Sequence, residues 1–284
     1  MRVLFKDVLG YRTRLLVEGN GAPVILLHGL GTLAERWLAN IDVLGEHHSV
    51  FAPDLLTHGL SQDVRFGDTA PQLRQVEHIV ALMDAFGVER STVIGSSYGG
   101  LLASLVAINH SDRVNRLVIV GSGSALHRPD RQAEVLKAVK ANTLKAFHEG
   151  TLAACRRRMQ NTTFDPSAVS EPALQMLLTA NALPGRLEAT GAFFDSVIQH
   201  ARRPECLVID RLEEIKAPTL IVTGRDDIRA SWERAEAASK RIPDCRLRIF
   251  ERCGHAPMLE HADDFNREVL AFLGAPAADR ARAS

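Results

Sequence analysis

Three features are scarce in this 284-residue chain: long apolar runs, an excess of one charge, and cysteine. No apolar run approaches the roughly 20 residues that a membrane-spanning helix needs, and no long apolar segment precedes a cleavage site near its start. Because 34 Lys and Arg residues balance 34 Asp and Glu residues, no overall field attracts the chain to nucleic acid or an anionic membrane. We therefore expect a cytoplasmic protein whose partner is a small-molecule substrate, with no nucleic acid and no membrane among its partners.

The cysteines argue against a disulfide scaffold and against a metal centre. Four cysteines are too few to staple a chain of this length, and their positions are too far apart for a metal knuckle: Cys155, Cys206, Cys245 and Cys253. The 11 histidines form no metal-ligand set at a useful spacing either. We expect reduced thiols, no metal and no organic cofactor. The sequence is compatible with a homodimer but does not decide the oligomeric state.

What the chain does have is a regular alternation of short apolar runs and longer helical patterns. Continuous apolar runs are typical of parallel strands that helices cover on both faces, and segment 76–86 carries apolar residues at helical spacing. The runs lie at 23–28, 50–54, 92–95, 116–120, 219–223 and 246–250, and a last amphipathic helix is expected over about 264–273. The predicted class is α/β, with a mostly parallel sheet flanked by helices.

This alternation stops between about residues 127 and 204. That segment is rich in Ala, Leu, Arg, Gln and Glu and has helical periodicity, so it is predicted to be an inserted helical cap. The core is then expected to comprise residues 1–126 and 205–274, and residues 275–284 are expected to form a flexible tail. Within the cap, Arg156-Arg157-Arg158 is predicted to be a solvated helix face.

A serine stands between two glycines where one apolar run ends, in the order Gly95-Ser-Ser97-Tyr-Gly99. In a Gly-x-Ser-x-Gly turn the serine occupies a sharp strand-to-helix corner, and the small residues on either side let neighbouring backbones pass. The strand before Ser97 and a helical pattern over 101–109 supply the context that this motif requires. Ser97 is predicted to be a catalytic nucleophile.

A serine hydroxyl is a weak nucleophile, so Ser97 needs a base and the base needs an orienting acid. His255 lies between a late strand and the final helix, in a loop marked by the adjacent glycine, and is the preferred base. The strand ending at residue 223 is followed by Asp226 and Asp227, either of which can emerge near Ser97. We favour Asp227 as the acid and leave Asp226 as the alternative.

The remaining requirement is an oxyanion hole. Gly29 follows the first strong strand and frees the local backbone, so that the Leu30 N–H can point into the site. Tyr98, the residue after the nucleophile, would give the second N–H. Leu30 and Tyr98 are the predicted oxyanion donors.

The order Ser97, Asp227, His255, with His28-Gly29 upstream, resembles the α/β-hydrolase family over about residues 10–273. The resemblance implies a mostly parallel sheet and a variable cap over the site. Residues 54–61 are similar to the family's Asp-x-Pro-Gly-x-Gly-x-Ser turn but lack its Pro-Gly. Members with epoxide hydrolase or haloalkane dehalogenase chemistry carry aspartate in place of the serine, so those activities are not expected.

The C-terminal stretch 253–269 resembles that of the meta-cleavage-product hydrolases, which break a carbon–carbon bond in dienoic ring-fission products. Those enzymes typically have asparagine where this chain has Ser96 and tryptophan where it has Ala256. The most natural pairing places Leu177 at the position of their cap arginine. Because these polar groups are missing, the sequence favours an ester over a dienoate as substrate.

We therefore predict a carboxylesterase-like serine hydrolase that cleaves a small, largely apolar ester through an acyl-enzyme on Ser97. The alternative is a meta-cleavage-product type carbon–carbon hydrolase. A ligand receptor without turnover and acyl transfer to an alcohol also remain open. The expected substrate-binding residues are Gly29, Ser96, Phe193 and Phe194.

Overall fold

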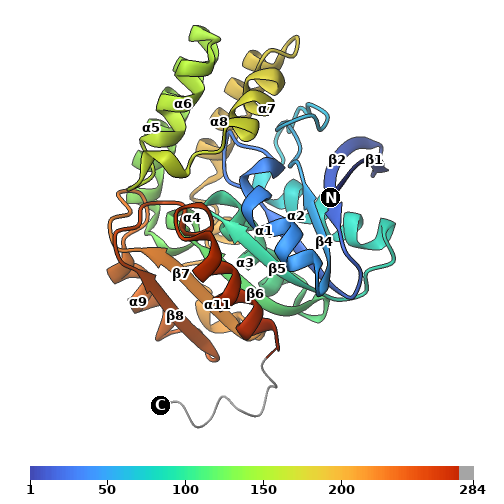
Figure 1. Ribbon diagram of the computed structural model, residues 1–284, viewed down its shortest axis with the longest axis vertical. Coiled ribbons are helices and arrows are strands. Elements are labelled where there is room, and N and C mark those ends of the chain that lie inside the picture. Colours follow the sequence, from blue (N-terminus) through green and yellow to red (C-terminus); the bar gives the residue numbers. More distant parts are fainter. Residues whose placement is uncertain (275–284) are drawn as a thin grey trace.

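An eight-stranded sheet forms the centre of the computed structural model, which describes residues 1–274 (Figure 1). The strands are β1 (Arg2–Val8), β2 (Tyr11–Glu18), β3 (Ala22–Leu27), β4 (His48–Pro53), β5 (Ser91–Ser96), β6 (Val114–Val120), β7 (Thr219–Gly224) and β8 (Cys245–Phe250). Their spatial order is β1-β2-β4-β3-β5-β6-β7-β8. The pairs β1–β2 and β2–β4 are antiparallel, and all other neighbouring pairs are parallel. The predicted class and the mostly parallel sheet are confirmed.

Helices cover both faces of the sheet, which explains why the central strands are apolar throughout. Every residue of β5 and of β7 is buried. The helices of the core are α1 (Leu38–Gly45), α2 (Pro71–Ala85), α3 (Tyr98–Asn109), α4 (Gly123–Leu126), α9 (Trp232–Ser239), α10 (Pro257–Glu260) and α11 (Ala262–Gly274). One hydrophobic cluster joins α1 and α11 to the sheet, and a second joins α2, α3 and α9 to the other face. The sheet is thus a buried middle layer whose strand ends are held rigidly.

The N-terminal hairpin β1–β2 is the part of the sheet that the sequence analysis did not predict. In β1 most residues are exposed, and Val3 and Phe5 leave about half of their surface in solvent. A strand at the edge of a sheet buries little, so it lacks the continuous apolar run by which the central strands were recognised.

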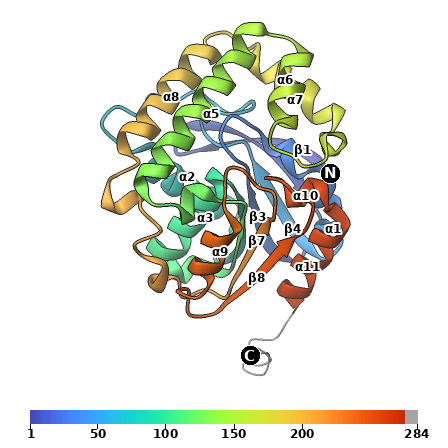
Figure 2. The ribbon, with the colours of Figure 1, turned by 90° about the vertical axis from the view of Figure 1, so that its left-hand side faces the viewer.

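Four further helices lie together at one end of the sheet, over its carboxyl edge (Figure 2). They are α5 (Pro129–Glu149), α6 (Leu152–Gln160), α7 (Glu171–Asn181) and α8 (Arg186–His200). They fall within the segment predicted to be the cap. The tail predicted over 275–284 lies outside the described residues. Within residues 1–274, no helix has both the length and the apolar character that crossing a membrane requires.

Candidate active site

The turn between β5 and α3 places Ser97 in a backbone conformation that a non-glycine residue rarely adopts. Its φ is 56° and its ψ is −118°. A Cβ at Gly95 would lie 2.1 Å from the Gly99 carbonyl oxygen, and a Cβ at Gly99 would lie 2.2 Å from the Leu27 carbonyl oxygen. Both glycines are therefore required for the close backbone crossing that raises the serine above the sheet. A 2.8 Å bond from the Ser97 N–H to the Val120 carbonyl fixes the corner.

The structure brings His255 and Asp227 together beside this corner. His255 Nδ1 lies 2.8 Å from Asp227 Oδ2, and both side chains are buried. The other oxygen of Asp227 accepts the N–H groups of Arg229 and Ala230 at 2.8 and 3.1 Å. Asp226 is exposed, and its carboxylate accepts a backbone N–H from the following loop. The geometry therefore supports Asp227 over Asp226 as the partner of the histidine.

The other ring nitrogen of His255 is free to act as a base. Because Nδ1 faces a carboxylate, it carries the proton and donates it. Nε2 is buried and has no hydrogen-bond partner among residues 1–274. His255 and Ser97 line the same cavity. No hydrogen bond joins Nε2 to the serine hydroxyl, and the hydrogen bonds of a catalytic site often tighten only when substrate binds.

A set of hydrogen bonds fixes the peptide that carries the Leu30 N–H. The Gly29 carbonyl accepts the Thr32 hydroxyl at 2.8 Å and His28 Nδ1 at 2.8 Å. His28 Nε2 accepts the Leu55 N–H at 3.0 Å, so the proton of this buried ring is on Nδ1. Since a peptide's N–H and C=O point in opposite directions, the Leu30 N–H is turned away from these donors. His28 thus helps to orient the predicted donor, whereas the sequence analysis used this histidine only as part of the family resemblance.

The second predicted oxyanion donor is set by the helix that follows the nucleophile. Tyr98 is the first residue of α3, so its N–H has no carbonyl to meet within the helix. Its own ring is fully buried, and burial raises the pKa of its phenol well above the usual value. The side chain therefore anchors the helix while the backbone N–H remains available beside Ser97.

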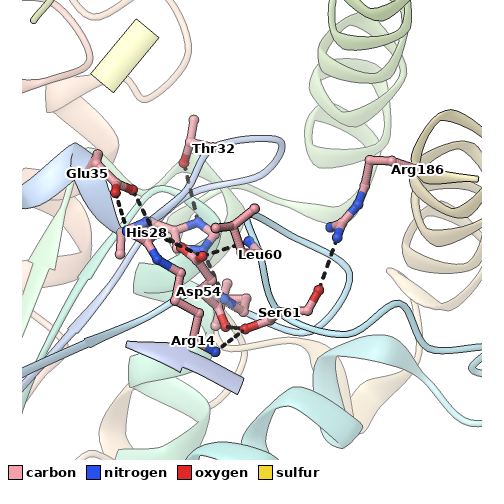
Figure 3. A network of polar contacts seen from close by, with 10 residues as sticks. Arg14, His28, Thr32, Glu35, Asp54, Leu60, Ser61 and Arg186 are labelled. Carbon is pink, nitrogen blue, oxygen red and sulfur yellow. Dashed lines mark hydrogen bonds and ion pairs between the residues drawn. The ribbon is translucent and has the colours of Figure 1, made fainter. Parts of the chain in front are cut away.

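A buried ion-pair network joins β2 to the segment that follows Gly29 and to the turn over 54–61 (Figure 3). Arg14 pairs with Glu35 and lies 3.1 Å from Asp54 Oδ2. The Asp54 carboxylate also accepts the N–H groups of Ala34 and Leu60, each at 2.8 Å. Burial opposes the charge of Arg14, but the two carboxylates outweigh it and raise the pKa of Arg14. The turn over 54–61, which lacks the family's Pro-Gly, is thus held by its aspartate.

The cavity at Ser97 lies between the core and helices α5 and α6. Gly29, Leu30 and Ser96 line it from the core, and two of these, Gly29 and Ser96, are predicted substrate-binding residues. Helix α5 contributes apolar side chains to the opposite wall, namely those of Val135, Leu136 and Val139. The cavity therefore combines a polar floor with a partly apolar roof.

The sequence analysis missed three arginines that line this cavity. Arg36 comes from the turn before α1, Arg158 from α6, and Arg229 from the loop after β7. Arg36 is only 8% exposed, and its Nη1 has no hydrogen-bond partner within the described residues. Arg158 donates to the Leu30 carbonyl at 3.2 Å and to the Thr143 hydroxyl at 3.2 Å. Neither the Leu30 carbonyl nor the Thr143 hydroxyl carries a negative charge that would balance the guanidinium group.

The predicted solvated face of α6 therefore needs a correction. Arg156 and Arg157 do form surface ion pairs, with Glu171 and Glu149. Arg158 instead points into the cavity. It lies four residues after Ala154, which is buried, so the two residues share one face of the helix. This helical spacing was the signal in the sequence that separates Arg158 from its two neighbours.

Phe193 and Phe194 are not among the residues that line this cavity, contrary to their prediction as substrate-binding residues. Both are almost fully buried in the core cluster that joins α8 to the sheet. The Phe193 ring packs edge-on against His58 and Tyr98, at centroid distances of 4.9 and 6.1 Å. The two rings fasten the cap to the core.

Known proteins share this architecture and this sequence pattern. A family model described as "alpha/beta hydrolase fold" matches residues 22–262. The chain is 30% identical over 267 residues to a 2-hydroxymuconate semialdehyde hydrolase of Pseudomonas putida, covering 93% of this chain and 91% of that protein. It is 31% identical over 274 residues to a 2-hydroxy-6-oxo-6-phenylhexa-2,4-dienoate hydrolase of Comamonas testosteroni, covering 94% and 93%.

A solved structure gives the same result in three dimensions. The meta-cleavage product hydrolase from Pseudomonas fluorescens IP01 superposes with a TM-score of 0.79 at 26% identity, and the match covers 95% of this chain and 97% of that one. The fold, the nucleophile corner and the matched family model lead to one conclusion. This chain belongs to the α/β-hydrolase fold family and is a hydrolase.

Proposed function

We propose that this hydrolase cleaves the carbon–carbon bond beside the ketone of a dienoic ring-fission product, with Ser97 as the nucleophile. The observation that carries the proposal is the cavity shared by Ser97 and His255, in a chain that resembles meta-cleavage-product hydrolases over nearly its whole length. These relatives favour carbon–carbon cleavage over the ester hydrolysis that the sequence analysis preferred.

In the first half of the reaction His255 Nε2 takes the proton of Ser97 as the serine oxygen attacks the ketone carbon. The Leu30 and Tyr98 N–H groups hold the oxyanion, a contribution of about 3 kcal/mol per donor in comparable sites. The carbon–carbon bond then breaks. The substrate's 2-hydroxyl proton must first move to the carbon beside the ketone, because only then is the electron pair of the broken bond delocalised along the chain. The pair ends on the 2-oxygen of the leaving group, which takes the proton from His255.

In the second half a water molecule releases the acyl group from Ser97. His255 takes a proton from the water as its oxygen attacks the acyl carbon, and then returns that proton to the serine oxygen. The sum is one water added across the broken bond, with hydrogen on the leaving carbon and hydroxyl on the acyl carbon. Asp227 keeps His255 in the required tautomer and stabilises its cation.

Ester hydrolysis is the second candidate, and one observation favours it. The positions where meta-cleavage-product hydrolases carry asparagine and tryptophan hold Ser96 and Ala256 here. Ester cleavage requires only a nucleophile, a base and an oxyanion hole, because an alkoxide leaves without help from a conjugated chain.

The two candidates are separated by comparing kcat/KM on two kinds of substrate. One is 2-hydroxy-6-oxohepta-2,4-dienoate, after which another similar hydrolase from Pseudomonas putida is named. The other is a series of p-nitrophenyl esters of increasing acyl length. The proposal predicts a higher kcat/KM for the dienoate. Efficient ester turnover with an unreactive dienoate would replace it with the ester activity.

A further inference from the structure

We infer that Arg36, Arg158 and Arg229 form an anion subsite that binds the carboxylate of the substrate acid. This inference rests on the proposed function, since it assigns a binding site to the carboxylate end of the substrate, which Ser97 does not attack. The three side chains come from the turn before α1, from the cap and from the loop after β7, and they meet in the cavity of Ser97.

The charges of these arginines are not balanced within the described part of the chain. The Arg36 and Arg229 side chains form no hydrogen bond or ion pair within residues 1–274, and Arg158 donates only to uncharged groups. The two nearby carboxylates are engaged elsewhere. Asp227 holds His255, and Glu260 accepts backbone N–H groups of both the cap and the His255 loop.

Burial and mutual repulsion make this arrangement costly without a ligand. Burial, with the charges of Arg229 and Arg36 acting in the same direction, lowers the pKa of Arg158 to about 9. Burial likewise lowers the pKa of Arg36 to about 10, assisted by Arg229. Guanidinium groups held together without acidic partners are stabilised by an anion placed among them.

The walls of the cavity favour an organic acid over an inorganic anion. Next to the guanidinium groups lie the apolar side chains of Val135, Leu136 and Val139. A phosphate would leave these side chains without a partner, whereas a carboxylic acid places its hydrocarbon chain against them. The carboxylate would then lie at the arginines and the reacting carbonyl at Ser97.

This subsite differs in position from the cap arginine to which meta-cleavage-product hydrolases owe part of their dienoate binding. That position pairs with Leu177, which here lines an apolar pocket beneath α7 together with Leu33 and Leu174. Arg36 borders both this pocket and the Ser97 cavity. The α7 position therefore carries no positive charge, and the arginines of the Ser97 cavity come from α6 and the core instead.

The test measures binding without turnover. In the Ser97→Ala protein, the dissociation constant of sorbate, a six-carbon dienoate, is compared by calorimetry with that of its neutral amide. We expect sorbate to bind more tightly than the amide. Adding Arg229→Gln should weaken sorbate binding about 10- to 100-fold and leave amide binding unchanged, because one charged hydrogen bond is lost. Arg229→Lys should restore part of the loss.

Arg157→Gln in the same Ser97→Ala background is the matched control, since Arg157 is the exposed neighbour of Arg158 on α6. It should leave both dissociation constants unchanged. Equal binding of sorbate and its amide, an equal loss in Arg157→Gln, or binding of inorganic phosphate as tight as that of sorbate would each overturn the inference. If sorbate binds as expected but the dienoate is not cleaved by the wild type, the anion subsite stands and the proposed reaction fails.

Discussion

Two groups of polar residues around the Ser97 cavity differ in how their members are paired. In the candidate catalytic group, Asp227 holds His255, and Thr32 and His28 hold the Gly29 carbonyl. The guanidinium groups of Arg36, Arg158 and Arg229 have no acidic partner within residues 1–274. The protein itself thus positions the catalytic group, whereas in the proposed subsite a substrate anion supplies the missing partner.

The largest effect is expected from removal of the proposed nucleophile. Ser97→Ala should lower kcat by about 10⁴- to 10⁶-fold on the dienoate, since the histidine and the acid act only through the serine. The measurement is a steady-state rate with an unfolding curve as control, because the side chain makes no hydrogen bond that the fold needs. Retention of more than about a hundredth of the activity would mean that the serine is not the nucleophile.

The next largest effect is expected when one of two adjacent carboxylates, Asp226 and Asp227, is replaced by an amide. Asp227→Asn should lower kcat by about 10⁴-fold, because an amide places the His255 proton on the wrong nitrogen. Asp226→Asn is the matched control and should stay within about threefold of wild type, since its carboxylate is exposed. A larger loss in Asp226→Asn than in Asp227→Asn would reverse the assignment.

The candidate catalytic residues could be predicted from the sequence because each follows the end of a buried strand. Ser97 follows β5 and Asp227 follows β7, and such runs are visible in the sequence. The parallel sheet then brings its carboxyl ends together, as expected for this class. The contribution of His28 was not predicted, because the orientation of its ring depends on the Leu55 N–H, which the turn after β4 supplies.

The substrate-binding residues were predicted less well because they depend on how the cap docks. Phe193 was expected in the site as an apolar residue of the predicted cap, yet α8 is rotated so that its ring packs into the core. Arg158 was expected in solvent because its two neighbours are charged, yet it is the member of the triplet that faces inward. The rotation of a helix about its axis is set by contacts distant in sequence, which single-residue character does not reveal.

A smaller effect tests the support of the oxyanion loop. Thr32→Val removes the hydroxyl that donates to the Gly29 carbonyl, and it should lower kcat by about 5- to 10-fold with little change in KM. Thr179→Val is the control, because that exposed hydroxyl donates to the Gln175 carbonyl within its own helix. Equal losses in the two variants would show that the Gly29 contact has no catalytic effect.

The smallest expected effect on catalysis is that of Phe193→Leu, which distinguishes a role in packing from a role in binding substrate. Phe193→Leu should destabilise the protein by about 1 kcal/mol in urea unfolding, because the leucine leaves part of a buried aromatic contact unfilled. Its KM for the dienoate should equal that of wild type. A raised KM without loss of stability would return Phe193 to the substrate site.

The most direct test of carbon–carbon cleavage identifies the products formed in ¹⁸O-labelled water. From 2-hydroxy-6-oxohepta-2,4-dienoate, the wild type should yield equal amounts of acetate carrying ¹⁸O and 2-hydroxypenta-2,4-dienoate, and the Ser97→Ala protein should yield neither. An unchanged dienoate under conditions in which p-nitrophenyl acetate is hydrolysed by the wild type, but not by Ser97→Ala, would contradict the account and leave an esterase.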